Sequence, residues 1–167
     1  TPEEVIEHFT AYADIKKMIS RGETRCRAEL TSGLPVDLRV LAPADYAAGL
    51  HHFTGSKAHN IALRKRAGKK NLKINEYGIF KGEKQISVSR EKQIYEVLDL
   101  AFVVPELREH TGQIKAAEQD RLPRLIQLQD IQGDLHAHTT ETDGLAGLEK
   151  MVQTAQDMGY QYLAITD

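Results

Sequence analysis

The chain has 167 residues, of which 41% are hydrophobic and 28% charged, and its formal net charge is −2. This composition is that of an ordinary globular protein with one domain or parts of two. No apolar stretch is long enough to cross a bilayer and no basic-then-apolar leader opens the chain, so we expect a cytoplasmic protein with no membrane partner. Cys26, the single cysteine, alternates with Ala28 and Leu30, which predicts a reduced, buried thiol.

The first 42 residues predict a helix followed by a β-hairpin. Thr1-Pro2-Glu3-Glu4 is typical of a helix start, and helical spacing continues irregularly to Ile19. Residues 23–30 and 36–41 alternate and are joined by the turn sequence 32–35, which indicates an antiparallel hairpin. The alternation places Asp37 and Arg39 on the face opposite the predicted core residues, which are Cys26, Ala28, Leu30, Val36, Leu38 and Val40.

Residues 43–110 predict a helix–turn–helix unit followed by a small β element. The first helix is expected from Pro43 to His52 and the second, capped by Ser56, to Lys69, with the turn at residues 54–56. Strands are expected at 72–80 and 85–88, and a short helix at 90–98. From Lys57 to Lys92 there are eleven Lys and Arg against three Glu, a net charge of +8. This charge fits either a solvated helix face or phosphate binding.

The remaining residues predict a connector and the beginning of another domain. Residues 111–128 are polar and weakly helical, and we place a linker at 111–132. A strand at 133–139, a helix at 145–158 and a strand at 162–165 form a βαβ start. A lone βαβ unit leaves its sheet edges uncovered, so we expect residues 133–167 to be an incomplete domain. The fold class is α+β.

Asp37 is an acid in the middle of a strand between apolar neighbours. A carboxylate in such a place costs stability unless it is paired or holds a metal ion. An ion pair with Arg39 on a solvated sheet face and a metal-binding role are both open from these residues alone.

The sequence Val36-Asp37-Leu38-Arg39-Val40, together with the stretch from Leu50 to Arg64 that contains Phe53-Thr54-Gly55-Ser56, closely resembles the palm-to-nucleotide-subdomain junction of family X DNA polymerases. Asn75-Glu76-Tyr77-Gly78 extends the resemblance, which runs from about residue 9 to residue 109. It implies that residues 1–42 are the rear of the palm and that 43–110 are the nucleotide- and DNA-binding subdomain. The implied partners are a deoxynucleoside triphosphate and primer-template or gapped DNA.

The resemblance also implies roles for single residues. Asp37 matches the third of three aspartates that hold two catalytic metal ions, Mg²⁺ or Mn²⁺. Phe53 and Gly55, with Thr54 in the same turn, match the contacts to the nucleotide sugar. Asn60 and Arg64, four residues apart on one helix face, match residues that meet the minor groove at the new base pair. Arg39 matches an arginine that changes partners as the subdomain closes, from an active-site carboxylate to Glu76 and Tyr77.

Two departures from the family pattern are visible. His52 stands where the family usually has an aromatic residue, commonly Tyr, so the exclusion of ribonucleotides is left open. The first two metal aspartates of the family form a DxD motif, which does not occur in these 167 residues, and the Gly-Ser phosphate-binding motif is also missing. We therefore expect this chain alone to have no polymerase activity.

His136 and His138 lie two apart in a predicted strand, with Asp143 in the turn that follows. A pair of surface histidines is one interpretation. However, Asp-Leu-His-x-His-Thr followed by Thr-Asp-Gly resembles the opening of a PHP (polymerase and histidinol phosphatase) domain, a metal-dependent phosphoesterase built as a distorted (β/α) barrel. The resemblance implies that His136, His138 and Asp143 bind divalent metals, Mn²⁺ or Zn²⁺, for 3′-5′ exonuclease chemistry.

Three functions thus follow from the sequence. The first is a gap-filling family X DNA polymerase with a tethered PHP exonuclease, of which this chain is an internal piece. The second is a non-catalytic DNA-binding module that uses the basic segment 57–92, and the third is a standalone PHP phosphoesterase. The oligomeric state is left open.

Overall fold

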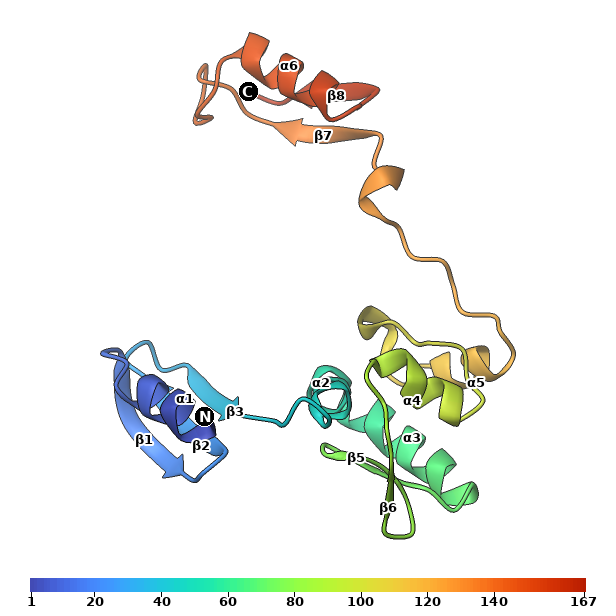
Figure 1. Ribbon diagram of the computed structural model, residues 1–167. Coiled ribbons are helices and arrows are strands. Elements are labelled where there is room, and N and C mark those ends of the chain that lie inside the picture. The colour runs from blue at the N-terminus through green and yellow to red at the C-terminus, as the bar shows by residue number, and fades with distance from the viewer. The chain divides into compact units, whose positions relative to one another are not determined.

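The computed structural model describes residues 1–167 and divides into two units, Thr1–Leu122 and Pro123–Asp167 (Figure 1). No helix has both the length and the apolar character that a membrane crossing needs.

The first unit opens with α1 (Pro2–Thr10), which is capped by the Thr1 side chain and by Glu4 in a capping box. A three-stranded antiparallel sheet follows in the order β1 (Ile15–Arg21), β2 (Arg25–Leu30) and β3 (Pro35–Arg39). The helical spacing predicted as far as Ile19 is therefore wrong beyond Thr10. Two register shifts in the β1–β2 pairing explain the error, because they leave half-buried Ile15 and Met18 three residues apart, a helix-like interval.

The β2–β3 pairing confirms the hairpin and the face of each side chain. Cys26 pairs with Leu38 and Ala28 with Val36, while Arg27 lies opposite Asp37. Cys26 and Ala28 are fully buried. The other predicted core residues, Leu30, Val36, Leu38 and Val40, are half-buried, and Val40 lies just beyond the end of β3.

Two helices, α2 (Tyr46–Thr54) and α3 (Lys57–Lys69), form the predicted helix–turn–helix. The Ser56 hydroxyl caps α3 by accepting a hydrogen bond of 3.1 Å from the His59 backbone N–H. The first helix begins at Tyr46 and not at Pro43, because residues 43–45 form a turn.

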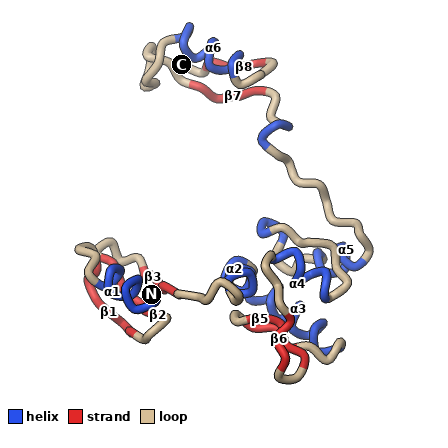
Figure 2. The backbone as a smooth tube through the Cα atoms, in the orientation of Figure 1, coloured by secondary structure: helices blue, strands red, loops and turns tan.

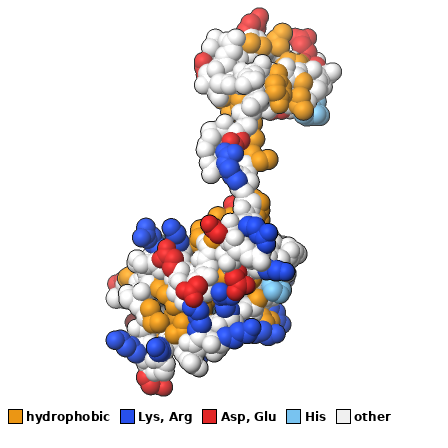
Figure 3. All heavy atoms as spheres, turned by 90° about the vertical axis from the view of Figure 1, so that its right-hand side faces the viewer, with side chains coloured by type: hydrophobic (Ala, Val, Ile, Leu, Met, Phe, Trp, Pro, Cys, Tyr) orange, Lys and Arg blue, Asp and Glu red, His pale blue; other side chains and the backbone are white.

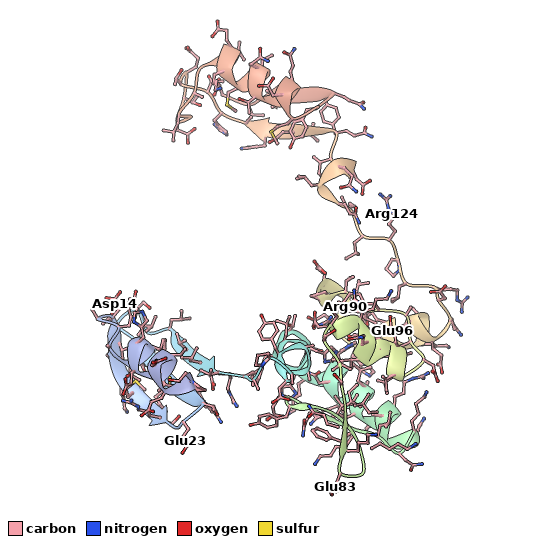
Figure 4. All side chains as sticks on the ribbon, in the orientation of Figure 1. Asp14, Glu23, Glu83, Arg90, Glu96 and Arg124 are labelled. Atoms are coloured by element: carbon pink, nitrogen blue, oxygen red, sulfur yellow. The ribbon has the colours of Figure 1, made fainter.

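The strand predicted at 72–80 is in fact two strands, β4 (Lys73–Asn75) and β5 (Gly78–Lys81), which with β6 (Lys84–Ile86) form an antiparallel sheet (Figure 2). The Asn75 side-chain oxygen causes the break, since it accepts hydrogen bonds from the backbone N–H groups of Tyr77 (3.0 Å) and Gly78 (3.1 Å). Gly78 has a φ of 153°, a conformation that favours glycine. Figure 4 places Glu83 at the tip of the next turn, between β5 and β6.

The core of the first unit lies among α3, the β4–β6 sheet and α4 (Glu91–Val97), where Leu63, Ile79 and Ile94 are buried. A 3₁₀ turn (Pro105–Leu107) leads to α5 (Gln113–Glu118), whose Ala117 joins the same core. The predicted linker began at 111, but residues 111–122 belong to the first unit. Burial of Ala117 and its backbone bond with Ala101 hold α5 there.

The second unit contains a 3₁₀ turn (Leu128–Asp130), β7 (Gly133–Ala137), α6 (Leu148–Asp157) and β8 (Tyr162–Ile165). β7 and β8 are parallel, as a βαβ unit requires. The helix begins three residues later than predicted, at Leu148, and Leu145 is fully exposed.

Candidate functional site

Asp37 projects from β3 and both of its carboxylate oxygens face arginines. Arg39 Nε donates to Oδ1 at 2.9 Å, and Arg25, which comes from the neighbouring strand β2, donates through Nη2 to Oδ2 at 3.1 Å. Partial burial opposes ionisation, but the hydrogen bonds and charges of Arg39 and Arg25 outweigh it, so the pKa of the Asp37 carboxyl is lowered. The carboxylate is therefore ionised at neutral pH.

This carboxylate fits the chemistry of a divalent metal ligand. Its side chain is 38% exposed, and an ionised carboxylate has about four acceptor positions, so the two arginine contacts leave capacity for a cation. The structure holds no group of three or more His, Cys, Asp or Glu that could bind a metal ion. Asp37 is therefore not part of a larger cluster of such residues in this chain.

Arg39 connects Asp37 to the turn between α2 and α3. Its guanidinium carbon lies 5.1 Å from the centroid of the Phe53 ring, a cation–π distance. The Arg39 side chain is 24% exposed. One arginine thus contacts both the predicted metal ligand and the ring predicted to line the nucleotide pocket.

The turn itself presents Phe53, which is 51% exposed, at the end of α2. The Thr54 hydroxyl donates to the Leu50 carbonyl at 2.6 Å and so faces its own helix. Gly55 has an extended backbone (φ −79°, ψ 154°), and a Cβ built there meets its nearest atoms at 3.5 Å, an ordinary contact. Folding therefore does not require glycine at position 55.

Asn60 and Arg64 differ in accessibility although they share one face of α3. Asn60 is 9% exposed, and its Nδ2 donates to the carbonyls of His52 (2.8 Å) and Gly55 (3.2 Å). Its amide thus braces the turn. Arg64 is exposed, and its Nε donates a long hydrogen bond of 3.4 Å to the Asn60 carbonyl.

Glu76 and Tyr77 lie at the tip of the β4–β5 turn. Tyr77 is 48% exposed and Glu76 is half-buried. The turn approaches α2 closely, since a Cβ built on Gly49 would lie 3.3 Å from the Glu76 carbonyl oxygen. No ion pair joins Arg39 to Glu76 in this structure, where Arg39 pairs with Asp37.

A buried polar network behind the turn was not anticipated from the sequence. The Tyr95 hydroxyl on α4 lies 3.0 Å from His51 Nε2 on α2 and 2.9 Å from His59 Nε2 on α3. Burial, with the nearby Arg108 charge, lowers the pKa of His51 to about 3 and that of His59 to about 4. Burial also raises the pKa of Tyr95. All three groups are therefore neutral at pH 7.

The direction of these hydrogen bonds follows from donor counting. A tyrosine hydroxyl donates once, so Tyr95 donates to one imidazole and accepts from the other. His59 Nδ1 is buried without a partner, and a bare acceptor is tolerated better there than an unpaired N–H. This favours a chain of bonds from His59 Nε2–H to Tyr95 and from Tyr95 O–H to His51.

Arg108 lies against this network and is fully buried. It pairs with Glu91 on α4 at 2.6 Å and donates to the Val103 carbonyl at 3.0 Å. Its own carbonyl accepts from the Ser56 backbone N–H at 3.0 Å, at the start of α3. No local sequence pattern predicts these contacts, because the partners are far apart in the sequence.

In the second unit, His136 and His138 lie with their Nε2 atoms 2.9 Å apart. Asp143 Oδ1 lies 2.9 Å from His138 Nδ1, the other ring nitrogen. Asp167 accepts hydrogen bonds from the backbone N–H of Thr139 (2.6 Å) and from the Thr142 hydroxyl (2.8 Å), which hold the intervening loop. The two histidines lie together as predicted. Asp143 contacts only His138, at the ring nitrogen that faces away from His136.

Known relatives of the chain are DNA polymerases. Residues 49–109 match the family model described as the DNA polymerase beta thumb. The chain is 37% identical over 171 residues to the DNA polymerase/3′-5′ exonuclease PolX of Bacillus subtilis (strain 168), covering 99% of this chain and 30% of that protein. It is 29% identical over 75 residues to the Repair DNA polymerase X of African swine fever virus (isolate Tick/Malawi/Lil 20-1/1983), covering 44% of this chain and 43% of that protein.

Among solved structures, Leishmania infantum polymerase beta in a ternary primer-template complex has a TM-score of 0.54 at 21% identity, covering 64% of this chain and 50% of that one. This likeness shows the fold. A three-stranded antiparallel sheet followed by a segment that matches the DNA polymerase beta thumb defines the class to which the first unit belongs. Because the match to the Bacillus protein covers 99% of this chain, the chain belongs to the bacterial family X DNA polymerases. It spans about 30% of that relative.

Proposed function

We propose that this chain supplies the third metal-binding carboxylate and the nucleotide- and template-contacting thumb of a DNA-directed DNA polymerase of the gap-filling repair type. The observation that carries the proposal is the arrangement at Arg39, which contacts ionised Asp37 on one side and the exposed Phe53 ring on the other. A nucleotide whose sugar lies on Phe53 would bring its reacting phosphate to the Asp37 side of the site.

Asp37 would hold Mg²⁺ or Mn²⁺ together with two carboxylates from outside this chain, and the bound ion would stabilise charge on the reacting oxygens. Phe53 offers a flat apolar wall for deoxyribose. Gly55 allows the main chain to approach the sugar, and the ordinary room around position 55 supports this role because packing gives no reason for glycine there. His52, half-buried beside Phe53, completes this wall.

Asn60 and Arg64 would act in sequence-independent checking of the new base pair. Arg64 is exposed and free to reach the template minor groove. Asn60 Nδ2 is occupied by the turn carbonyls, so its contact with an incoming base would use its side-chain oxygen or follow release of the turn. Glu76 and Tyr77 are the second pair of partners proposed for Arg39.

For the second unit we propose the start of a PHP 3′-5′ exonuclease domain. Asp143 contacts His138 at Nδ1, which leaves the lone pair of His138 Nε2 available to a metal ion. Nε2 of His136 lies beside it, and two imidazole nitrogens fit Mn²⁺ or Zn²⁺ as ligands. In this geometry Asp143 orients the ring of His138. Weakened Mn²⁺ or Zn²⁺ binding by His136→Ala and His138→Ala in titration calorimetry would support these ligands, and unchanged binding would exclude them.

The polymerase proposal is tested by Asp37→Asn in a full-length polymerase that carries this segment. Primer extension on gapped DNA should fall by about a thousandfold or more, because one of the metal carboxylates is neutralised, while DNA binding stays within a few-fold. Glu29→Gln is the matched control, since Glu29 is also an ion-paired carboxylate of this sheet. Equal extension by the Asp37 variant and the control would leave the chain as a non-catalytic DNA-binding module. We also propose that the 167-residue chain alone incorporates no nucleotide.

A further inference from the structure

A groove of about 690 Å³ lies between α3 and α5, on the side of α3 that is turned away from the core. One wall comes from α3 and carries Ile61, Lys65 and Lys69, and the other comes from the α5 segment and carries His110, Ile114 and Lys115. Figure 3 shows one face of this unit, where Lys and Arg side chains lie close to a histidine.

The groove carries unpaired positive charge. Lys65, Lys69 and Lys115 are exposed, and none of the ion pairs in the structure includes them. Glu118 is the one acid among the lining residues, and it is held by Arg66 at 2.8 Å. That arginine is the main cause of the lowered pKa of Glu118. The three lysines are therefore not neutralised from within the groove.

The groove has an apolar surface that includes Ile61 and Ile114, and its lining contains no Phe, Tyr or Trp. Ile61 is 37% exposed and Ile114 is half-buried. A positively charged groove with apolar sides suits a strand whose phosphates meet the rim and whose sugars and bases lie inward. Without Phe, Tyr or Trp as stacking platforms, binding there depends mostly on charge and is indifferent to base sequence.

The position of the groove indicates which strand it would take. Lys65 follows Arg64 directly, and Lys69 lies one helical turn further along α3, about 6 Å away, a spacing comparable with that of consecutive phosphates on an extended strand. The α5 wall lies beyond residues 49–109, so it is an addition to the thumb that the family model matches. The groove is thus separate from the predicted nucleotide contacts but begins beside Arg64.

We propose that the α3–α5 groove binds the phosphate backbone of single-stranded DNA, namely template that continues past Arg64. This inference rests on the proposed polymerase function. A basic groove could also attract an acidic peptide, but three spaced ammonium groups beside the apolar side chains Ile61 and Ile114 match the regular charge and amphipathic edge of a nucleic-acid strand better.

The test is the binding of a fluorescent single-stranded oligonucleotide to the 167-residue chain, measured by anisotropy over a range of salt concentrations. The variant Lys65→Gln/Lys69→Gln/Lys115→Gln should bind about tenfold more weakly at low salt. Its log–log salt slope should fall by about two, since each phosphate that the protein neutralises contributes roughly 0.7 to that slope. The matched control, Lys73→Gln/Lys81→Gln/Lys84→Gln, removes the same charge from the β4–β6 sheet. It should stay within twofold of the unaltered chain.

If the two triple variants lose the same amount of affinity for the oligonucleotide, the groove is not the binding site. A loss of affinity for primer-template DNA caused by Arg64→Ala would in that case still support the proposed function. An equal loss on blunt duplex and on single strand would overturn the single-strand assignment. Competition by poly-glutamate as effective as that by the oligonucleotide would point to an acidic peptide instead. If the unaltered chain binds no single-stranded DNA at low salt, this inference fails, while the Asp37→Asn test in a full-length polymerase still decides the proposed function.

Discussion

Arg39 is the side chain on which the geometry of the candidate site depends most. It donates to Asp37 at 2.9 Å and lies over the Phe53 ring at 5.1 Å. The sequence allows two roles for Asp37, an ion-pair partner or a metal ligand, and the structure contains the ion pair. The two roles are compatible, because an arginine can hold the carboxylate while no metal ion is bound and can release it or share it when a metal ion binds.

Arg39→Ala should therefore change the kinetics of a full-length polymerase. Loss of the restraint frees Asp37. Loss of the contacts that we propose with Glu76 and Tyr77 would disfavour closure, so we expect correct-nucleotide incorporation to fall by about tenfold or more. Single-turnover kinetics on gapped DNA would measure this. Arg25→Ala removes the other hydrogen bond to Asp37 but no contact to Phe53, and it should have the smaller effect. Unchanged rates in the Arg39 variant would reject the switch.

Gly55→Ala tests the close approach of the main chain to the nucleotide. The added methyl group has room at 3.5 Å, so the melting temperature should stay within about 2 °C. In a full-length polymerase the KM for the deoxynucleotide should rise several-fold, since the methyl group stands where the sugar would lie. Gly68→Ala, at an open position of α3, serves as the control. A normal KM for the Gly55 variant would place the sugar elsewhere.

At the scale of elements, the Tyr95 hydroxyl joins three helices around one turn. It lies about 3 Å from His51 on α2 and from His59 on α3 (3.0 and 2.9 Å) while itself belonging to α4. The turn that presents Phe53 and Gly55 lies between these two histidines. The network thus supports the turn that carries the predicted nucleotide contacts.

Tyr95→Phe should destabilise the first unit by about 1–3 kcal/mol, because two buried imidazole nitrogens lose their partner while the ring volume is retained. Urea unfolding followed by circular dichroism would measure the change. Tyr46→Phe is the matched control, since Tyr46 is 59% exposed on α2. If the two variants unfold alike, the hydroxyl has no structural role.

The same network predicts that stability falls in mild acid. The pKa values of His51 (about 3) and His59 (about 4) lie below the ordinary value of 6.5. Below pH 6.5 the unfolded chain therefore binds protons that the folded chain does not. Stability rises with pH across this window and is lost as the pH falls from about 6.5 towards 4, by up to about 2.7 kcal/mol per pH unit for two groups.

Unfolding free energies between pH 7.5 and 5 would show this slope, above the range in which the carboxyl groups take up protons. The variant His51→Asn/His59→Asn should be less stable at pH 7.5 but should have a shallower slope. An identical slope in the variant would assign the acid sensitivity to other groups.

At the scale of the whole molecule, the second unit opens with residues 123–132, a segment that leads from the end of the first unit at Leu122 to β7. Ile126 and Leu128 are 79% and 81% exposed, and residues 121–127 are neither helix nor strand. Figure 4 shows Arg124 on this connecting segment, where it pairs with Asp130 at 2.6 Å. The lysines of α3, although exposed, lie in a helix packed on the core.

Limited trypsin digestion should accordingly cut first at Arg121 or Arg124, because exposed backbone without secondary structure is the preferred site of cleavage. Mass spectrometry of the early products would identify the bond. The variant Arg121→Gln/Arg124→Gln should delay the first cut without altering the melting temperature. A first cut within α3 would mean that the first unit opens more readily than its packing indicates.

Local sequence determined a large part of this protein. Alternation set the faces of β2 and β3, so the burial of Cys26 and the exposed side of Asp37 followed from period two. Ser56 determined where α3 begins, because its hydroxyl caps the helix three residues on. These features depend on neighbours a few residues apart, and such neighbours are readable from the chain itself.

Tertiary structure decided the rest. The bulged strand β1 looks helical until it pairs with β2, and α5 looks like a linker until Ala117 reaches the core. The meeting of His51 and His59 with Tyr95 spans 44 and 36 residues, and no local pattern encodes a contact at that separation. Arg39 is near Asp37 in the sequence, but the second partner, Arg25, is brought to Asp37 by strand pairing. The energy of that charge therefore depends on its three-dimensional surroundings.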